Sequence, residues 1–314
     1  MMPDGRCTTA IVTGGLRGLG RAMALGLARE GYCVAAVGHI DADVAKMTSE
    51  AADTGLACRL VLLIADLRKP KDCDRVVDET LAAFGGADIL VNNAGLTFTY
   101  IWPDLGRRAS PPKSWEASDE IVQAVMDTNY VAADQMTRRL APRLVGRGWG
   151  RIINVTTKLD TMNKHGSSAY GPSKAALEMA TQVLAKELAG TGVTANVLNP
   201  GAGADTEGMA PEFRAASRAG RIPRLVAPER MVAPLLWLVS PAADTVNGRR
   251  FDANAWDPGV SPHIAAARAG RPAGFELRRD DVESEHPIRA DEATPGTAAK
   301  ERDTCGRIST RAAP

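Results

Sequence analysis

A glycine-rich turn near the start of the chain is the feature that most constrains the fold. It lies between an apolar run at 7–13 (CTTAIVT), typical of a buried strand, and an amphipathic run at 21–29, typical of a helix. Glycines in the turn allow tight backbone geometry and close approach of another group. The free N–H groups at the start of the helix attract phosphate, so the turn indicates a dinucleotide site. The expected contacts are Gly14, Arg17, Gly18, Leu19 and Gly20.

Strand and helix patterns then alternate along most of the chain. The run at 33–37 (CVAAV) is apolar throughout, which is typical of a parallel strand covered on both faces. The alternation predicts an α/β fold: a single doubly wound parallel-sheet Rossmann domain over 1–258, with the cofactor and substrate sites together. Further strands are predicted at 60–65, 89–92, 151–155, 194–198 and 249–251, with helices at 43–54, 70–84, 119–144, from 170 onward and 230–239.

The composition changes after about position 258. Residues 259–314 are rich in Arg, Asp, Glu, Ala, Pro and Gly, and they carry few large apolar side chains. Such a segment buries too little apolar surface to offset its ordering entropy. We therefore expect a polar, disordered C-terminal tail, with a binding role for it as the alternative.

Charge and cysteine pattern exclude several classes of protein. The formal net charge of +1 provides no strong electrostatic attraction to nucleic acid or to an anionic membrane. No apolar run approaches the roughly 18 residues that a membrane-spanning helix needs. The first residues lack the apolar segment of a signal peptide. The five cysteines (7, 33, 58, 73 and 305) have no metal-ligand spacing, so we expect reduced, mostly buried thiols and no metal. These features predict a soluble, cytoplasmic protein with a small-molecule partner.

Tyr170 and Lys174 are the candidate catalytic pair. Their spacing places both side chains on one face of a predicted helix, one turn apart. A nearby ammonium group stabilises a phenolate and lowers the phenol pKa, so the pair is suited to general acid/base chemistry. The alternative is a solvated helix face without catalytic function.

The residues after the second predicted strand bear on which dinucleotide binds. An NAD site usually has an acid there that binds the adenosine ribose, whereas this chain has Gly38 followed by His39. Arg17 is a cation near the same ribose, and His39 adds a donor. Asp41 lies too late in the chain and is expected to cap the helix at 42–54. These residues favour NADP(H), with NAD(H) as the alternative.

Asp66 follows the third predicted strand, with Leu67 beside it. The Asp66 carboxylate is placed to accept a hydrogen bond from an adenine amino group. Both residues are therefore expected cofactor contacts, and the alternative for Asp66 is a cap for the following helix.

Several motifs in a fixed order resemble the classical short-chain dehydrogenase/reductase family over residues 7–256. They are Thr13-Gly14-x-x-x-Gly18-x-Gly20, Asp66, Asn92-Asn93-Ala94-Gly95, Asn129, Tyr170-x-x-x-Lys174 and Asn199-Pro200-Gly201. The resemblance implies that Tyr170 exchanges a proton with a carbonyl or alcohol while hydride moves to or from the nicotinamide. It implies that Lys174 lowers the Tyr170 pKa and binds the nicotinamide ribose, and that Asn129 holds a water linking Lys174 to solvent.

The resemblance also assigns the remaining cofactor contacts. Asn93, Ala94 and Gly95 are expected to line the cofactor beside the sheet, and Pro200 and Gly201 to face the nicotinamide. Related chains commonly pair through the helices that carry Asn129 and Tyr170, so a homodimer or homotetramer is expected.

Two positions depart from the family pattern. The hydroxyl partner of the tyrosine, normally Ser, is Thr157 here, with Thr156 before it. Threonine keeps the hydroxyl that stabilises developing charge, and its extra methyl narrows the rotamers. After Pro200, the family threonine that contacts the nicotinamide amide is one residue late in this chain, at Thr206.

The loops 96–117 and 202–226 are expected to cover the substrate. They carry Phe98, Tyr100, Trp102, Arg107, Arg108, Met209, Phe213, Arg214 and Arg218. An apolar wall with some cations fits a mid-sized carbonyl or alcohol; the alternative is that the aromatic side chains only pack the loops. Lys164 and His165 lie in the segment before Tyr170, and His165 is more often a surface residue in such a place.

The predicted function is hydride transfer between NADP(H) and a carbonyl or secondary alcohol, with Tyr170 as general acid/base. The alternatives are an NAD-dependent polyol or sugar-alcohol dehydrogenase of the same fold, and a nucleotide-binding regulatory protein without turnover. The change to Thr157 and the unusual loop 96–117 keep the second alternative open.

Overall fold

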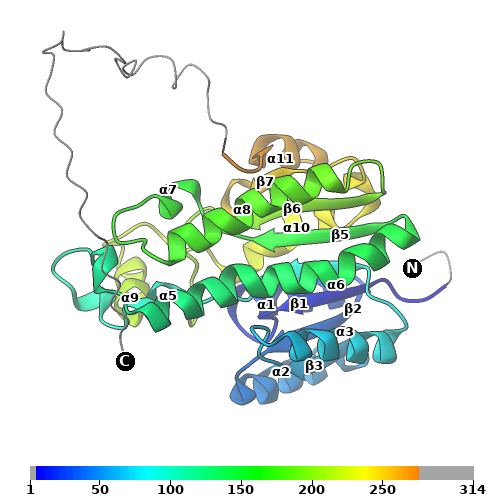
Figure 1. The fold of residues 1–314 in the computed structure, drawn as a ribbon, viewed down its shortest axis with the longest axis horizontal. Coiled ribbons are helices and arrows are strands. Elements are labelled where there is room, and N and C mark those ends of the chain that lie inside the picture. Colours follow the sequence, from blue (N-terminus) through cyan, green and yellow to red (C-terminus); the bar gives the residue numbers. More distant parts are fainter. Residues whose placement is uncertain (1–4, 276–314) are drawn as a thin grey trace, which may run out of the picture. The chain divides into compact units, whose positions relative to one another are not determined.

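The computed structural model describes residues 5–275, drawn in colour in Figure 1. These residues belong to one compact unit. No helix in this part of the chain is long and apolar enough to cross a membrane.

Eight strands in the described residues form one sheet, in the order β3-β2-β1-β4-β5-β6-β7-β8. Every pair from β3 to β7 is parallel, and β8 pairs with β7 in antiparallel fashion. The doubly wound parallel sheet predicted from the alternation is therefore confirmed. The strands are β1 (Thr9–Thr13), β2 (Cys33–Gly38), β3 (Leu60–Ile64), β4 (Ile89–Asn92), β5 (Gly150–Val155), β6 (Val193–Asn199), β7 (Arg249–Asp252) and β8 (Gly270–Pro272).

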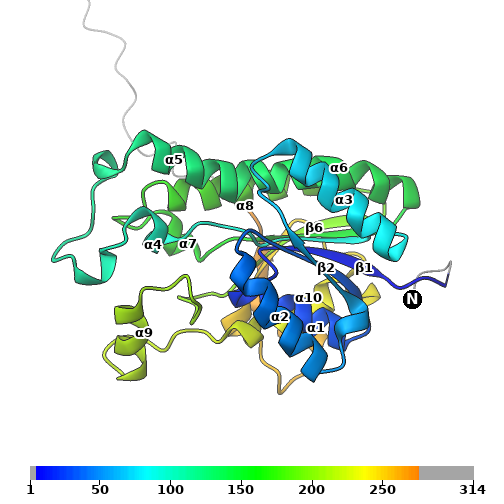
Figure 2. The same ribbon diagram turned by 90° about the horizontal axis from the view of Figure 1, so that it is seen from below.

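Helices cover both faces of the sheet (Figure 2). Successive side chains of a strand point to opposite faces, so Val12 packs in one apolar core and Ile11 in the other. The first core lies under α1 (Gly18–Arg29), α10 (Val232–Leu238) and α11 (Pro262–Ala269), and the second under α3 (Pro70–Phe84), α6 (Ala132–Arg147) and α8 (Tyr170–Glu187). The other helices are α2 (Asp41–Asp53), α4 (Phe98–Ile101), α5 (Asp119–Met126), α7 (Leu159–Met162) and α9 (Pro211–Arg218).

The long helix predicted at 119–144 is interrupted. Helix α5 ends at Met126, a π-helical segment spans Asp127–Val131, and α6 continues from there. A π-helical turn adds a residue to the turn and is common at functional sites. Asn129 lies inside this segment and is fully buried.

The ordered domain extends beyond the boundary expected at 258. Helix α11 packs three buried alanines on the core, and β8 adds a strand beside β7, with Arg250 opposite Arg271. The expectation of disorder from 259 is therefore wrong for 259–275, because short alanine side chains and backbone pairing supply order without large apolar residues. The rest of the expected tail, 276–314, lies outside the described residues.

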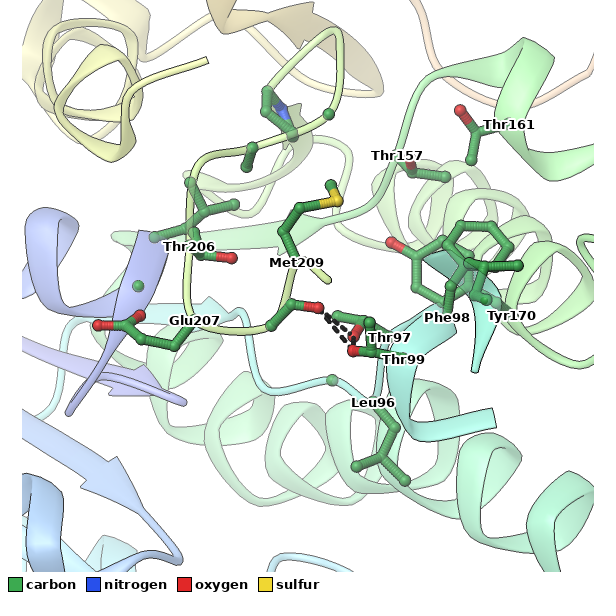
Figure 3. Close-up of a pocket in the computed structure, with 18 of the residues that line it drawn as sticks. Leu96, Thr97, Phe98, Thr99, Thr157, Thr161, Tyr170, Thr206, Glu207 and Met209 are labelled. Atoms are coloured by element: carbon green, nitrogen blue, oxygen red, sulfur yellow. Dashed lines mark hydrogen bonds between the residues drawn. The ribbon is translucent and has the colours of Figure 1, made fainter. Parts of the chain in front are cut away.

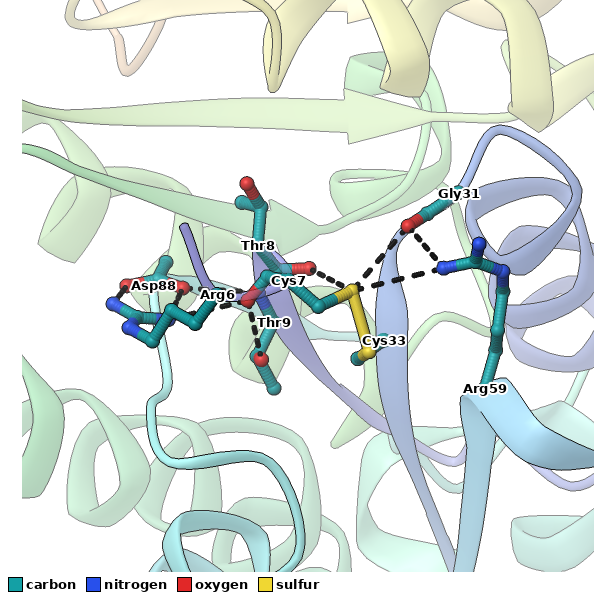
Figure 4. Close-up of a disulfide and its surroundings, with 8 residues drawn as sticks. All are labelled: Arg6, Cys7, Thr8, Thr9, Gly31, Cys33, Arg59 and Asp88. Carbon is teal, nitrogen blue, oxygen red and sulfur yellow. Dashed lines mark hydrogen bonds and ion pairs between the residues drawn. A yellow bond between two sulfur atoms is a disulfide. The ribbon is translucent and has the colours of Figure 1, made fainter. Parts of the chain in front are cut away.

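Cys7 and Cys33 form a disulfide at the amino ends of β1 and β2 (Figure 4). The expectation of reduced thiols is wrong for this pair, because the parallel pairing of β1 and β2 places Cys33 beside the residues that lead into β1, with the Cα atoms of Cys7 and Cys33 5.9 Å apart. Cys73 is buried and free, as expected, whereas the free Cys58 is exposed. Beside the bridge, the Arg59 guanidinium donates to the Gly31 carbonyl at 2.7 Å.

Cys7→Ser is expected to lower the free energy of unfolding by about 3 kcal/mol, because the bridge closes a loop with a sequence separation of 26. For a domain of this size, that corresponds to a fall in Tm of roughly 5–10 °C. Thermal unfolding with and without a reducing agent measures the effect. Cys58→Ser is the control and should leave Tm unchanged. A wild-type Tm that does not respond to reductant would contradict the bridge.

Candidate active site

A cavity of about 800 Å³ lies at the carboxyl ends of the parallel strands (Figure 3). It runs from the end of β2, past the glycine turn and the end of β4, to the start of α8 and the segment after β6. The sequence-predicted residues that line it are Gly14, Arg17, Gly18, Leu19, His39, Asn93, Ala94, Gly95, Thr157, Tyr170, Lys174 and Pro200. The predicted residues outside its lining are Gly20, Asp66, Leu67, Asn129 and Gly201.

The glycine turn has the backbone geometry that its sequence predicts. Gly14 and Gly18 have φ of 63° and 53°, in the left-handed region that favours glycine. A β-carbon at Gly20 would collide with the Gly14 carbonyl oxygen, so Gly20 serves close packing under the turn. The first turn of α1 contains no acidic residue of its own, and the Glu207 carboxylate approaches the helix start from the segment after β6, 3.7 Å from where a β-carbon at Gly18 would lie. A bound anion would use the positive end of α1 and displace this carboxylate.

Asn93, directly after β4, hydrogen-bonds to the glycine turn. Its side-chain amide donates to the carbonyl oxygens of Thr13 and Gly14, at 2.9 and 3.2 Å. The Thr13 hydroxyl in turn accepts from the backbone N–H groups of Asn93 and Ala94. The polar atoms of Asn93 thus hold the turn in shape.

The adenosine end of the cavity contains an acid that sequence reasoning missed. Asp43 is mostly buried, lines the cavity, and lies 3.8 Å from the Arg17 guanidinium. Helix α2 begins at Asp41 itself and has no side-chain cap at Ile40, so the predicted cap at Asp41 is wrong. An NAD site usually has its acid at the end of β2, whereas the acid that faces this site comes from the first turn of the following helix.

Asp66 is held by its own neighbour. Its carboxylate accepts from Arg68 Nε at 2.8 Å and Nη2 at 2.9 Å, and these hydrogen bonds lower the Asp66 pKa. Helix α3 begins at Pro70 after Lys69, so the alternative of a cap by Asp66 is wrong.

Tyr170 and Lys174 lie together at the start of α8, facing the cavity. The residue before them, Ala169, is the one non-glycine residue within 5–275 with positive φ (61°), so the chain enters the helix through a strained conformation. Lys174 is buried, and its amine donates to the Val155 carbonyl at 2.9 Å. Burial disfavours the ammonium form and lowers the Lys174 pKa to about 8.

The structure reverses the expected direction of the Tyr170 pKa. Burial of the phenol raises this pKa, and a hydrogen bond with the Thr157 side chain opposes the rise. Lys174 is not among the groups that lower the Tyr170 pKa. The phenol of Tyr170 therefore favours its protonated form in this site.

Phe98 packs on Tyr170, with ring centroids 4.5 Å apart (Figure 3). The rings are tilted by 42°, and their separation lies at the short end of the range typical of aromatic pairs. Phe98 belongs to α4, a short helix within the loop 96–117, so this loop forms part of the catalytic surroundings.

Asn129 connects the segment after β4 to helix α8. Its side-chain oxygen accepts from the Leu96 N–H at 2.7 Å, and its amide donates to the Leu96 carbonyl and to Ser173 Oγ. Gly95 makes room for this arrangement, since a β-carbon there would lie 3.2 Å from Asn129 Oδ1 and 3.3 Å from Lys174 Nζ. The role of Ser173 as a hydrogen-bond partner of Asn129 was not predicted, because a serine inside a helix shows no sequence pattern that indicates such a contact.

The two loops expected to cover the substrate are joined. The hydroxyl groups of Thr97 and Thr99 both donate to the Gly208 carbonyl, at 2.9 and 2.7 Å (Figure 3). Apolar side chains from both loops line the cavity: Phe98, Leu105, Met209, Phe213, Ile222 and Leu225. Thr206 lies against the glycine turn, where a β-carbon at Gly18 would come within 3.2 Å of its methyl group.

Some of the remaining loop candidates line the cavity, as expected of substrate contacts, and others only pack the loops or lie outside the cavity. Arg108, Lys164 and His165 line the cavity, although Arg108 is bound by Asp104 and Glu116. Trp102 is buried in a small apolar cluster beside the site, and Tyr100 is exposed. The candidates outside the cavity lining are Tyr100, Trp102, Arg107, Arg214 and Arg218.

Comparisons with known proteins agree with this fold and site. A "Short-chain type dehydrogenase/reductase" from Picea abies is 36% identical over 216 residues, which cover 67% of this chain and 76% of the relative. A crystal structure from Beutenbergia cavernae, assigned as an NAD(P) dependent gluconate 5-dehydrogenase with bound NADP, is 34% identical with a TM-score of 0.66, covering 78% of this chain and 94% of that one. A 3-ketoacyl-(acyl-carrier-protein) reductase from Brucella melitensis, complexed with NADH, is 27% identical with a TM-score of 0.66, covering 78% and 96%.

The family model for short chain dehydrogenase matches residues 8–216, the segment that contains the glycine turn, Asn129, Thr157, Tyr170 and Lys174. The chain is therefore a member of the short-chain dehydrogenase/reductase family, whose relatives are NAD(P)-dependent oxidoreductases.

Proposed function

We propose that this protein transfers hydride between NADP(H) and a carbonyl or secondary alcohol, with Tyr170 as the general acid/base. The observation that carries the proposal is that Thr157, Tyr170 and Lys174 line the same cavity as the glycine turn. One pocket can therefore receive a dinucleotide and the group that it reduces or oxidises.

The residues present fit a dinucleotide. Gly14 and Gly18 bring no side chain to the turn, and the start of α1 provides N–H donors for a pyrophosphate. Lys174 would bind the nicotinamide ribose, Asn93, Ala94 and Gly95 would line the cofactor, and Pro200 and Gly201 would face the nicotinamide. Asp66 and Leu67 remain the proposed adenine contacts. A bound nicotinamide supplies the hydride acceptor or donor.

The protein groups would then handle the proton. In reduction, the protonated Tyr170 phenol donates to the carbonyl oxygen, and in oxidation its deprotonated form accepts from the alcohol. The Thr157 hydroxyl donates a hydrogen bond to the same oxygen and stabilises its developing charge. Asn129 keeps Leu96 and Ser173 in place behind Lys174.

The apolar lining supports a substrate with a mid-sized apolar part and one carbonyl. Nucleotide oxidation or reduction with a panel of ketones, sugar acids and 3-oxoacyl thioesters tests this proposal, since related proteins are described with such substrates. The turnover of at least one panel member is expected. Tight NADPH binding without turnover of any member would favour the non-catalytic alternative, a nucleotide-binding regulatory protein.

Arg17→Ser is expected to weaken NADPH binding about 10- to 100-fold and to change NADH binding little. The reason is that Arg17 lines the adenosine end, where a 2′-phosphate would gain a charge-assisted hydrogen bond of about 1.5–3 kcal/mol. Calorimetric titration with both nucleotides measures the difference.

Arg21→Ser is the matched control for Arg17→Ser. Arg21 lies one turn further along α1, pairs with Glu50 at 3.7 Å, and is not among the cavity-lining residues. It should leave both affinities unchanged. Wild-type NADH binding as tight as NADPH binding would overturn the NADP preference and favour the NAD-dependent polyol or sugar-alcohol dehydrogenase, with Asp43 as the acid that binds the ribose.

We also propose a cytoplasmic location, since the cytoplasm supplies reduced nicotinamide nucleotides. A homodimer or homotetramer through the helices that carry Asn129 and Tyr170 remains part of the proposal. Sedimentation of the purified chain tests the oligomeric state.

A further inference from the structure

A fully buried ion pair lies behind the catalytic hydroxyl groups. Arg250 on β7 and Glu178 on α8 have no exposed side-chain surface, and Arg250 Nη1 lies 3.1 Å from Glu178 Oε1. A charge buried in this way is unfavourable unless other groups hold it, so the surroundings of the pair are informative.

The ion pair hydrogen-bonds to the two residues that directly follow β5, Thr156 and Thr157. Arg250 Nη2 donates to the backbone carbonyl of Thr157 at 3.0 Å. The other carboxylate oxygen of Glu178 accepts from the Thr156 hydroxyl at 2.9 Å. Thr156 is thus fixed through its side chain and Thr157 through its backbone, which leaves the Thr157 hydroxyl to face Tyr170 and the cavity.

The same cluster reaches the segment expected to face the nicotinamide. Arg250 Nη2 lies 3.5 Å from Asp252, whose carboxylate accepts from the Asn199 amide at 2.7 Å. Asn199 in turn accepts from the Gly201 N–H at 2.8 Å. The cluster therefore connects the carboxyl ends of β5, β6 and β7. It links the backbone of Thr157 to Gly201, which is expected to face the nicotinamide.

On the basis of the function proposed above, we propose that Arg250 and Glu178 are positioning residues for Thr157. The guanidinium fixes the backbone of Thr157, and Glu178 fixes the guanidinium, so that the Thr157 hydroxyl is held at the substrate oxygen beside Tyr170. Neither residue touches substrate. A misplacement of about 1 Å at a reacting group costs on the order of 100-fold in rate, so a modest release of this backbone has a large effect.

Arg250→Met is expected to lower kcat about 100-fold, and Glu178→Gln about 10-fold, with the KM for the nucleotide changed by less than about 3-fold. Arg151→Met is the matched control, because Arg151 is also fully buried and ion-paired, with Asp244, at the opposite end of β5. All three variants should lower Tm, and only those at 250 and 178 should lower kcat in folded protein.

A double-mutant cycle separates positioning from general destabilisation. Once Thr157→Val has removed the hydroxyl, adding Arg250→Met should cause little further loss of kcat, because there is no hydroxyl left to position. Losses that simply multiply would overturn the proposal, as would a folded Arg250→Met with wild-type kcat. If Arg250→Met does not fold, Arg250→Lys and Glu178→Gln are measured in the same cycle, and wild-type kcat in both overturns it.

A readout without turnover distinguishes this proposal from the proposed function. A fluorotyrosine at position 170 reports its ionisation by fluorine NMR. Since the Thr157 hydroxyl lowers the Tyr170 pKa, the apparent pKa at 170 should rise in Arg250→Met and stay unchanged in Arg151→Met. An unchanged pKa in a folded Arg250→Met overturns the positioning role. Absence of turnover in wild type would instead reject the function while leaving this titration decisive.

Discussion

Tyr170→Phe is expected to lower kcat about 1000-fold while leaving the fold and nucleotide binding intact. General acid/base groups contribute about 10²- to 10⁴-fold, and the phenol of Tyr170, which meets the Thr157 hydroxyl in the cavity, is the proposed acid/base group. The ring itself remains, so its contact with Phe98, at 4.5 Å between centroids, is kept. Steady-state turnover of the best panel substrate, with NADPH affinity measured by calorimetry, tests both halves of the expectation.

Tyr32→Phe is the matched control for Tyr170→Phe. The substitution removes the same phenol oxygen, and burial also raises the pKa of Tyr32. Tyr32 lies immediately before β2, at the amino end of the sheet and away from the cavity. Its variant should retain wild-type kcat. A Tyr170→Phe protein that turns over at more than about one tenth of the wild-type rate would reject the phenol as the proton donor, since the expected contribution is far larger.

Much of the sheet could be predicted because its strands are short apolar runs covered on both faces. The strand at 89–92 has the predicted bounds, and the other predicted strands differ by one or two residues at one or both ends. The last strand, β8, could not be found this way, because Gly-Arg-Pro is neither apolar nor alternating and is ordered only by pairing with β7. The π-helical segment was also missed, since its residues fit an ordinary helix and only the inward position of Asn129 distinguishes it.

The site residues that sequence revealed are those whose chemistry depends on local spacing. Glycines at a turn, or a tyrosine and a lysine one helical turn apart, can be read from neighbouring positions. Arg250 and Glu178 could not, because they meet across two elements 72 residues apart in the chain. The direction of the Tyr170 pKa was wrong for a related reason: burial is set by the whole fold, and here it raises the pKa of the phenol.

Lys174→Met is expected to give a protein that is inactive and yet more stable at pH 7. Burial lowers the Lys174 pKa from 10.5 to about 8, so the folded protein binds this proton less tightly than the unfolded chain. That difference destabilises the wild-type fold by about 3 kcal/mol at pH 7. Loss of the bond to the Val155 carbonyl offsets about 1–2 kcal/mol, which leaves a net gain for the variant of about 1–2 kcal/mol.

The sign of this effect should depend on pH. A lowered lysine pKa in the folded state means that wild-type stability rises as pH increases from about 8 toward 10.5, since the unfolded chain holds the extra proton over this range. The Tm advantage of Lys174→Met, on the order of 2–6 °C at pH 7, should therefore shrink above pH 8, reverse between about pH 9 and 10, and be a disadvantage at pH 10.5. Its kcat/KM should fall about 100-fold or more, because the amine proposed to bind the nicotinamide ribose beside Tyr170 is absent.

Lys186→Met on the same helix is the control for Lys174→Met. Lys186 is exposed, so its replacement should change neither activity nor the pH dependence of Tm. Thermal unfolding of wild type and both variants at pH 7, 8.5 and about 10.5 gives the comparison. A Lys174→Met protein that is less stable than wild type at pH 7 would show that burial of the Lys174 amine does not lower the free energy of unfolding. One that keeps wild-type kcat/KM would remove Lys174 from the reaction.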